Sequence, residues 1–323
     1  MEQKVENVKN STEQRDKGIM KIKDIFPILT LIVMTVFFQS VSGGKVLTIL
    51  NFSALFNEVF MIVIITSATV FIISQGNNDL SIAGNVGLCC AVAAYATRAG
   101  SLVFALPAAL ITGTIVGMIN GLIVTKLKIE SFIATIAMSF VYKGILELIL
   151  PEANISVSFD ILKADQFPIK LAVVFSIVIV AFFLFTYSSF GKKCRAIGSR
   201  KEVALQSGVN VDKTIIMGYM LVGLFSGVVA FFSLARSSGA SLGSGSNLQF
   251  NALQAILLGG ASLTGGSGTR FRFAVIGSII MAILVNGMSM WGLYPLLQQL
   301  IRGMIFLVTV ALSFDRKNIE VLK

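Results

Sequence analysis

Residues 191–213 read GKKCRAIGSRKEVALQSGVNVDK and stand between two long apolar runs. The segment carries six Lys and Arg residues against one Glu and one Asp. Short loops rich in Lys and Arg stay on the cytoplasmic side of a membrane. The segment therefore predicts a cytoplasmic loop in a protein that crosses a membrane several times.

A short helix is expected inside this loop. Gly198 and Ser199 break the chain, and Ser199 stands three residues before Glu202, which is the spacing of a capping box. The pattern predicts a polar helix over 200–206, with Gly208 placed to end it. Such a helix can dock into a groove on a soluble partner. The alternative is an ordinary basic loop that only fixes the topology.

The composition also points to a membrane. Of the 323 residues, 55% are hydrophobic and only 13% are charged, whereas soluble domains carry about 25% charged residues. Too few charges remain to cover a water-exposed surface, so we expect the lipid bilayer to surround the chain. The net charge is +10, but the excess lies in short loops and not on a soluble domain. No nucleic-acid partner is therefore expected.

The apolar runs give the expected architecture. A spanning helix needs about 20 mostly apolar residues, and ten runs of about that length can be drawn. The third and eighth are short, contain Gly and begin with polar residues, so re-entrant segments are the alternative there. The expected fold is an all-α integral membrane protein of about ten transmembrane helices. The ten runs are 25–41, 56–75, 79–97, 102–124, 131–150, 168–189, 214–235, 250–267, 272–292 and 294–313.

Charged residues between the runs set the orientation. Lys126 and Lys128 mark a second cytoplasmic loop, and residues 151–167, with three acids against one Lys, are expected outside. Both termini are then expected in the cytoplasm. The predicted organisation is a cytoplasmic tail, one transmembrane domain that includes the loop 191–213, and a second cytoplasmic tail. The bounds of these three parts are 1–24, 25–313 and 314–323.

Two Gly-rich helices suggest an internal repeat. Residues 113–121 read GTIVGMING and residues 277–287 read GSIIMAILVNG, and each follows a polar, Gly-rich segment, at 75–84 and 258–268. In the ten-helix arrangement the two units are five helices apart and run in opposite directions. This is the pattern of an inverted repeat of five plus five helices, which transporters use to alternate access. The alternative is chance similarity among Gly-rich helices.

Four polar residues in or beside the apolar runs are candidates for a substrate path. A charge in a membrane helix must face protein or water. Asp79 either contributes to the path or caps the helix that begins near Ser81. Asn120 and Asn286 either line the path or bridge two helices. For Arg302 there are two alternatives. Its side chain either faces the substrate path or the seam between two subunits, or it extends to the outer membrane–water interface.

The sequence offers no pattern typical of an enzyme. Cys89, Cys90 and Cys194 lack metal-ligand spacing, and no phosphate-binding loop of the form GxxxxGK followed by Ser or Thr occurs. Neither paired acids nor a metal cluster marks a catalytic site. We therefore expect no catalytic residue, no metal and no cofactor in this chain. An ion-driven carrier would use buried acids or His as relays, but the chain has no His and few deep acids.

Four motifs follow one another along the chain: GNNDLS at 76–81, ALQSGVNV at 204–211, LLGGASLTGGSGT at 257–269, and the closing pairs Arg302-Gly303 and Asp315-Arg316. Together they resemble the permeases of the ribose/xylose/galactose class of ATP-binding-cassette sugar importers. The likeness covers roughly residues 25–317. The first motif departs from the Gly-Gly-Ile-Asp-Leu-Ser of that family at Asn77 and Asn78.

The resemblance implies a set of partners. Two permease chains, identical or different, pair around one central path, and an extracytoplasmic solute-binding protein delivers the sugar. Cytoplasmic ATPase subunits bind the ATP and Mg. The short helix in the loop 191–213 would be the coupling helix that sits in the ATPase groove. Its expected contact residues are Ser199, Arg200, Glu202, Ala204 and Gly208.

The resemblance also implies a function. The chain is expected to be the permease subunit of a bacterial importer and to lie in the inner (cytoplasmic) membrane. It would move a monosaccharide or a related polyol at the expense of ATP that its partner hydrolyses. A nucleoside permease of the same wider class is the alternative for the substrate. An ion-coupled secondary carrier is the alternative of another class.

Overall fold

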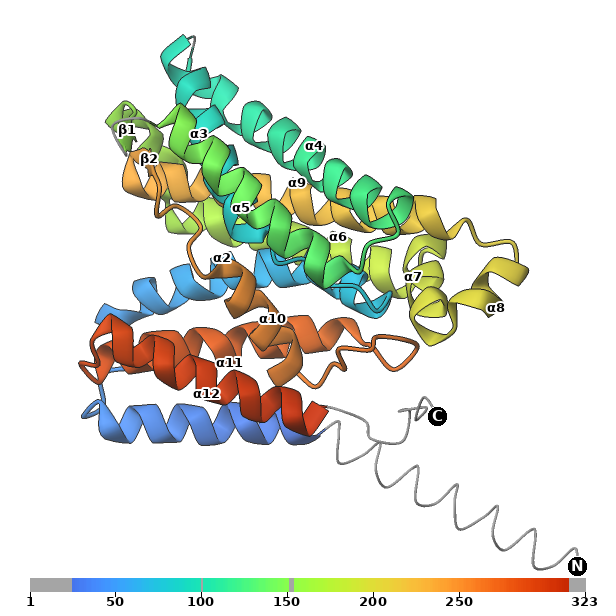
Figure 1. The fold of residues 1–323 in the computed structure, drawn as a ribbon. Coiled ribbons are helices and arrows are strands. Elements are labelled where there is room, and N and C mark those ends of the chain that lie inside the picture. Colours follow the sequence, from blue (N-terminus) through green and yellow to red (C-terminus); the bar gives the residue numbers. More distant parts are fainter. Residues whose placement is uncertain (1–24, 100, 151–153, 314–323) are drawn as a thin grey trace, which may run out of the picture.

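The computed structural model describes residues 25–99, 101–150 and 154–313. The two predicted tails, 1–24 and 314–323, lie outside the described residues. Helices make up nearly all the regular structure in the described ranges (Figure 1). The predicted all-α architecture is confirmed at this level.

Most of the predicted apolar runs are observed as helices whose bounds differ from the prediction by a few residues. The long helices are Ile25–Val41, α2 (Ile49–Ser74), α3 (Ile82–Ala99), α4 (Ala105–Lys126), α5 (Ser131–Ile149), α6 (Phe167–Thr186), α9 (Val211–Ser237), α11 (Phe271–Met290) and α12 (Pro295–Ser313). The short elements are α7 (Ser189–Ser199), α8 (Lys201–Gln206), α10 (Leu248–Leu258), the 3-10 helices η1 (Leu102–Phe104) and η2 (Phe159–Asp165), and the strands β1 (Asn154–Ser156) and β2 (Gly239–Ser241).

Six of the described helices are long and apolar enough to cross a membrane, namely α2, α4 together with η1, α5, α6, α9 and α11. Large apolar side chains such as Phe140, Leu148 and Val180 are exposed on their outer surfaces. A contiguous apolar surface of this kind needs lipid around it. The chain is therefore an integral membrane protein. The count of ten crossings stays a prediction, because Ile25–Val41, α3, α10 and α12 fall outside this set.

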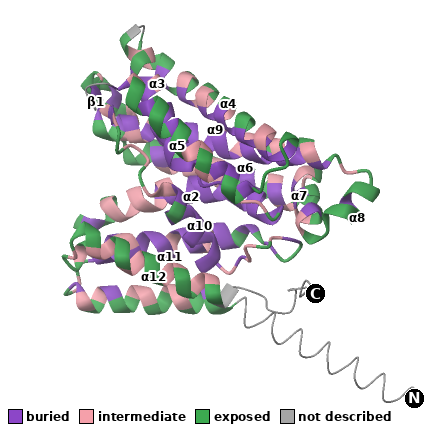
Figure 2. Cartoon of the chain, in the orientation of Figure 1, coloured by how far each residue is buried: buried purple, intermediate pink, exposed green. Residues whose placement is uncertain are grey.

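The eighth predicted run, 250–267, is not one helix. The helix α10 ends at Leu258, where Gly259 and Gly260 follow, and Gly260 adopts a φ of +102° that residues with a side chain rarely take. Eleven residues of α-helix are about 16 Å long, roughly half the thickness of the hydrocarbon core. Figure 2 shows α10 buried over most of its length, and Phe250 near its start is exposed. The prediction of a single helix over 250–267 is therefore wrong, and the observed short helix fits the re-entrant alternative.

A seam of glycines joins α4 to α9. A Cβ added at Gly113 would lie 2.1 Å from the carbonyl oxygen of Gly223, and one at Gly117 would lie 2.2 Å from the carbonyl oxygen of Tyr219. From the other side, a Cβ at Gly223 would lie 2.0 Å from the oxygen of Gly113. Small residues at this spacing let two membrane helices approach until their backbones touch. In Figure 1 α4 runs along the upper edge of the molecule and α9 lies directly beneath it.

A second close-packed group joins α2, α10 and α11. The hydroxyls of Thr66 and Ser278 lie 2.7 Å apart and link α2 to α11. A Cβ at Gly277 would lie 1.7 Å from the carbonyl oxygen of Ala255, so α10 rests directly on the backbone of α11. The helices α10, α11 and α12 lie with Ile25–Val41 in the lower part of Figure 1.

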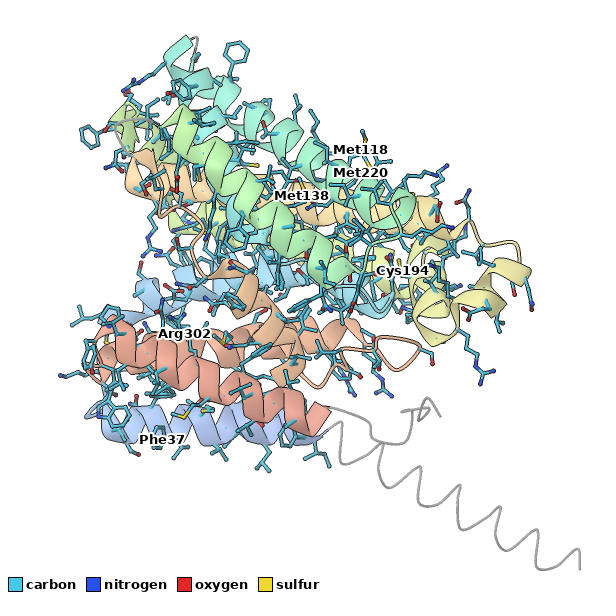
Figure 3. The ribbon with its side chains drawn as sticks, viewed as in Figure 1. Phe37, Met118, Met138, Cys194, Met220 and Arg302 are labelled. Atoms are coloured by element: carbon cyan, nitrogen blue, oxygen red, sulfur yellow. The ribbon has the colours of Figure 1, made fainter. Side chains whose placement is uncertain are left out.

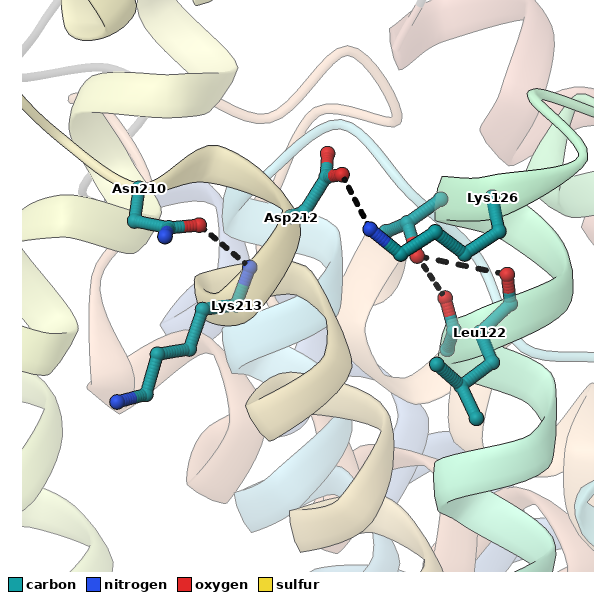
Figure 4. Close-up of polar contacts among 7 residues, drawn as sticks. Leu122, Lys126, Asn210, Asp212 and Lys213 are labelled. Atoms are coloured by element: carbon teal, nitrogen blue, oxygen red, sulfur yellow. Dashed lines mark hydrogen bonds and ion pairs between the residues drawn. The ribbon is translucent and has the colours of Figure 1, made fainter.

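The two ends of the molecule separate the charged segments as the sequence predicts. At one end Lys126, which ends α4, forms an exposed 3.4 Å ion pair with Asp212 at the start of α9 (Figure 4). At the far end of α9, β2 pairs antiparallel with β1 from the acidic segment 151–167. The two basic loops therefore share one end, and the acidic segment lies at the other.

A buried ion pair stabilises that second end. Lys170 on α6 lies 3.1 Å from Asp165, which ends η2, and their side chains are only 5% and 19% exposed. Lys170 also donates a hydrogen bond to Asn57 on α2. One lysine thus connects the neighbouring elements η2 and α6 to α2, which is more than 100 residues away in the sequence.

Replacing Lys170 with methionine should lower the free energy of unfolding by about 3 kcal/mol, because Asp165 would keep a buried charge without its partner. The double variant Lys170→Met/Asp165→Asn should recover most of that loss. Chemical denaturation of the purified protein in detergent measures both. A single variant within about 0.5 kcal/mol of the wild type would show that the pair carries no stability.

Candidate functional site

The motif at 76–81 forms a non-helical segment whose second half, Asp79 to Ser81, is buried between helices. After α2 ends, Gly76 adopts a φ of +78° and the chain runs without helical structure until α3 begins. The backbone N–H of Asn78 donates to Ser131 Oγ (3.1 Å), and the backbone carbonyl oxygen of Asn78 accepts from the hydroxyl of Tyr219 (2.9 Å). The amide of Leu80 donates to Thr135 Oγ1 (3.0 Å). Irregular backbone at this depth survives only when such groups are satisfied by protein.

A chain of buried polar side chains continues from this segment. Asp79 Oδ1 accepts from the amide (2.8 Å) and the hydroxyl (2.6 Å) of Ser81. Asn120 on α4 donates to Ser81 Oγ (2.7 Å) and accepts from the hydroxyl of Tyr142 on α5 (2.7 Å). The structure therefore brings the predicted residues Asp79 and Asn120 together. The bonds of Asn120 match the helix-bridging alternative. Asp79 accepts from Ser81, which precedes the first residue of α3, so within the described residues it stabilises the turn before the helix and accepts from none of the helix N–H groups.

Replacing Tyr142 with phenylalanine should lower the free energy of unfolding by about 1–2 kcal/mol, because Asn120 Oδ1 would lose its donor in a buried place. The exposed Tyr294 gives a matched control, and Tyr294→Phe should change nothing measurable. Thermal unfolding followed by loss of the monodisperse peak in detergent measures both. Equal midpoints of thermal unfolding for the two variants would show that the hydrogen bond from Tyr142 to Asn120 does not stabilise the protein.

Asn286 lies in a different place. It forms a two-way amide pair with Asn51 on α2, with N···O distances of 2.7 and 3.0 Å, and Asn51 also donates to the carbonyl oxygen of Val46 (2.8 Å). Asn51 stands at the opposite end of α2 from Gly76, about 38 Å along the helix axis. Asn286 is therefore separate from Asp79 and Asn120, and its geometry is that of a bridge between α2 and α11.

Arg302 lies on α12 beside α10, where Figure 3 labels it. Its Nη1 donates to Asn251 Oδ1 (3.2 Å), and its carbonyl oxygen accepts from Gln254 Nε2 (3.0 Å). The three amides of α10 were missed in the sequence, although QFNALQ at 249–254 places three polar residues within six positions of an apolar run. That pattern is unusual in a membrane segment and was the available signal.

The predicted coupling helix is present as α8, but its start differs from the prediction. Arg200, not Ser199, is the N-cap, and its side chain makes no capping bond. The hydroxyl of Ser199 instead accepts from the amide of Ser267 (2.9 Å). The predicted capping box with Glu202 is therefore wrong, because the Gly-rich loop after α10 competes for the same hydroxyl.

The end of α8 agrees with the prediction. Gly208 adopts a φ of +78°, its amide donates to Leu205, and the amide of Val209 donates to Ala204. These two bonds form a Schellman motif, which needs a left-handed residue at this position. Ala204 is buried, whereas Val203 and Leu205 are 50% and 53% exposed. The helix, which is mostly exposed in Figure 2, thus presents two apolar side chains to its surroundings.

The helix α7 connects α8 to the core, at a place where the sequence predicts a loop. A Cβ at Gly198 would lie 2.0 Å from the carbonyl oxygen of Ser74, and the same oxygen accepts from the amide of Gly266 (3.0 Å). Gln75 donates to Cys194 Sγ (3.0 Å). Burial raises the pKa of the Cys194 thiol to about 12, so it stays protonated at neutral pH. The end of α2, α7 and the loop after α10 thus form one packed junction.

Comparison with known proteins identifies the family. Residues 51–310 match the family described as branched-chain amino acid transport system / permease component. The chain is 31% identical over 311 residues to the ribose import permease protein RbsC of Bacillus subtilis (strain 168), covering 93% of this chain and 94% of the relative. It is 28% identical over 320 residues to the galactose/methyl galactoside import permease protein MglC of Escherichia coli (strain K12), covering 91% and 94%. It is 30% identical over 279 residues to the L-arabinose ABC transporter permease protein AraH of Azospirillum brasilense, covering 84% and 82%.

No solved structure matches the chain. The named relatives are transporter permeases of ribose, galactose and arabinose, and they match this chain over most of their length. The resemblance to sugar-importer permeases is therefore confirmed. Because the family match also spans most of the sequence, the chain belongs to the permease-component family of membrane transport proteins that includes these sugar permeases.

Proposed function

We propose that this chain is the permease subunit of an ATP-binding-cassette importer and that it moves a monosaccharide or a related small polyol. The names of its relatives support the substrate class, because they carry ribose, galactose and arabinose. The observation that carries the coupling proposal is α8. It is a short, exposed helix with apolar side chains, closed by Gly208 and joined through Ser199 to the loop after α10.

The proposed coupling route begins at the ATPase partner, which would bind the ATP and Mg. The partner would contact α8 through the surface that includes Arg200, Glu202, Val203 and Leu205, while Ala204 packs against the core. Movement of α8 would then pass through α7 to the junction where Ser74 accepts from Gly266. A second permease chain and an extracytoplasmic solute-binding protein complete the proposed assembly, in a bacterial inner membrane with α8 on the cytoplasmic side.

An inverted repeat of five plus five helices is part of the proposal. In such a repeat α2 corresponds to α9, α3 to α10, and α4 to α11. The contacts between helices support this correspondence, because α4 packs along α9 and α11 packs along α2. In the same way α3 contacts α4 and α10 contacts α11. The polar segments 75–84 and 258–268 do not fit this pairing, because the first precedes α3 and the second follows α10. Two such halves could rock against each other and expose one site to either side in turn.

Reconstitution of the assembled transporter in proteoliposomes tests the function. Uptake of labelled D-ribose, D-galactose, L-arabinose, a nucleoside and L-leucine is measured with ATP and the ATPase on the α8 side and the binding protein on the other. We expect uptake of at least one sugar, and only with ATP. Uptake of leucine or the nucleoside without any sugar would refute the substrate proposal. Sugar uptake driven by an ion gradient in the absence of ATP would refute the coupling proposal.

A further inference from the structure

The loop that follows the re-entrant helix α10 is held in tight turns. It comprises residues 259–270, joins α10 to α11, and is called the glycine loop. Gly260, Gly265 and Gly266 adopt φ values of +102°, +70° and +93°, which residues with a side chain rarely take. The amide of Gly265 donates to the carbonyl oxygen of Ser262 (3.1 Å) and closes one of the turns. The glycine loop is therefore a defined piece of backbone and not a slack connection.

One side of the glycine loop rests on the end of α2. A Cβ added at Gly265 would lie 2.3 Å from the carbonyl oxygen of Ile73 and 2.7 Å from the amide nitrogen of Gly76. The amide of Gly266 donates to the carbonyl oxygen of Ser74 (3.0 Å). Backbone packed directly on backbone has no flexible side chain between the two segments that absorbs a shift. A displacement of the loop is therefore transmitted to what it touches.

The other side of the glycine loop touches the end of α7, next to α8. A Cβ added at Gly198 would lie 2.7 Å from the amide nitrogen of Gly266. The amide of Ser267 donates to Ser199 Oγ (2.9 Å), and the same hydroxyl donates to the carbonyl oxygen of Arg195 (2.9 Å). Ser199 is the last residue of α7, and α8 begins two residues later. The hydroxyl of Ser199 therefore joins the glycine loop to the helix that carries α8.

The helix α10 and the glycine loop contain buried polar groups that are not satisfied. Within the ranges that the structure describes, the side-chain oxygens of Gln249, Gln254 and Thr269 are buried and have no hydrogen-bond partner. Such groups are unfavourable where they stand and act as a reservoir of strain. A different position of α10 that gives these oxygens partners recovers that free energy. The helix is therefore an element whose position a moving neighbour can change.

We propose that the glycine loop carries the movement of α8 to the re-entrant helix α10, and that Ser199 is the positioning residue that connects the two. When the ATPase displaces α8, the end of α7 moves with it and takes the loop along through the hydroxyl of Ser199. Because the loop continues directly from α10, the helix shifts as well. This inference rests on the proposed ATP-driven transport and adds the element that responds to it within the membrane domain.

The first test removes the hydroxyl of Ser199. Ser199→Ala should lower sugar-stimulated ATP hydrolysis by the assembled transporter about fivefold, the effect of one hydrogen bond. Ser199→Thr keeps the hydroxyl and should match the wild type. Ser207→Ala is the matched control and should also match it. Ser207 is exposed like Ser199, and its hydroxyl likewise donates to a carbonyl oxygen four residues earlier at 2.9 Å, but it bonds no distant segment among the described residues.

A fluorescent label on α10 separates lost transmission from lost ATPase binding. Phe250, near the start of α10, is 45% exposed, and the described cysteines are buried, so Phe250→Cys takes up an environment-sensitive maleimide dye. Emission is compared between the ATP-free transporter and the transporter trapped with ATP and vanadate, with bound ATPase verified by gel filtration. We expect a spectral shift in the otherwise wild-type protein and in Ser207→Ala, and a smaller shift in Ser199→Ala.

A variant of the loop itself leaves the surface of α8 untouched. Gly266→Ala strains the φ of +93°, while its Cβ comes no closer than 3.4 Å to any neighbour. It should reduce the spectral shift as Ser199→Ala does, and it takes the place of Ser199→Ala if that variant fails to bind the ATPase.

The failures of the two proposals are distinguishable. Equal stimulated ATP hydrolysis in Ser199→Ala and Ser207→Ala, or equal spectral shifts in both, would overturn the role of the glycine loop while the wild type still carries a sugar. The same holds if α10 shows no shift in a wild type that transports. A wild type in which ATP supports no uptake of sugar would refute the proposed function, and the role of the loop would fall with it.

Discussion

Replacing Gly113 with alanine should destabilise the protein by about 3 kcal/mol and sharply lower the yield of folded material. The added Cβ would lie 2.1 Å from the carbonyl oxygen of Gly223, which is a backbone atom in the middle of α9. No rotamer change can relieve that overlap, so α4 and α9 would have to move apart along the whole glycine seam. Fluorescence size-exclusion chromatography across a temperature series measures the loss.

Gly144 on α5 provides the matched control for this prediction. A Cβ added there meets no heavy atom within 4 Å. Gly144→Ala should therefore leave stability unchanged or raise it by up to about 1 kcal/mol, because alanine is the better helix former. Equal yields and midpoints for Gly113→Ala and Gly144→Ala would mean that α4 and α9 are not in backbone contact.

Replacing Gly208 with valine should uncouple ATP hydrolysis from transport while the protein still inserts and assembles its membrane core. Gly208 holds a φ of +78°, which costs residues with a side chain about 1–2 kcal/mol, and a β-branched residue fits it worst. A Cβ there meets no neighbour, so the change acts on the backbone of α8 and on nothing else. Substrate-stimulated ATP hydrolysis by the assembled transporter should fall more than about tenfold.

Gly144 on α5, far from this junction in the sequence, serves as the control for the coupling experiment. It also has open space around its Cβ position, but its φ lies outside the left-handed region. Gly144→Val should keep stimulated ATP hydrolysis close to that of the wild type. Normal coupling in Gly208→Val would contradict the assignment of α8 as the docking helix.

The sequence predicted the large features of the fold for simple physical reasons. Apolar runs must form helices in lipid because their backbone groups have no other partner, so α4, α5 and α6 were drawn within a few residues. Lys126 and the basic residues of the loop 191–213 correctly indicated that these two segments lie at the same end of the molecule. Gly208 was correctly placed at the end of α8 because few residues other than glycine tolerate a left-handed conformation.

The failures have physical reasons too. Ser199 fits a capping box within its own segment, but the amide of Ser267, 68 residues away, takes its hydroxyl. The sequence predicts a loop where α7 stands, because three basic residues dominate this stretch. The apolar face of the helix consists of few residues, among them Cys194 and Ile197, which are three positions apart and are buried. A pattern within one short segment cannot show that a distant segment will take a hydrogen-bonding group such as the Ser199 hydroxyl.

The candidate site was predicted in fragments. Asp79 and Asn120 were singled out as unusual polar residues in apolar surroundings, and the structure joins them through Ser81. The pairing of Asn286 with Asn51 spans 235 residues, and no single-sequence pattern reports a contact of that range. The amides of α10 are absent from the predicted residues, although the run 250–267 is one of the two for which a re-entrant segment is the alternative.

The central claim is that α8 faces the cytosol and is covered by a separate ATPase. The described cysteines, Cys89, Cys90 and Cys194, are buried, so the single variant Leu205→Cys places one reactive thiol on the exposed face of α8. Phe159→Cys places one on η2 at the opposite end, where Phe159 is 76% exposed.

The most direct measurement is labelling of these two thiols with a membrane-impermeant maleimide in intact cells and in inside-out vesicles. The account predicts that Leu205→Cys reacts only in inside-out vesicles and is protected by added ATPase, and that Phe159→Cys reacts only in intact cells. Labelling of Leu205→Cys in intact cells, or equal labelling with and without the ATPase, would contradict it.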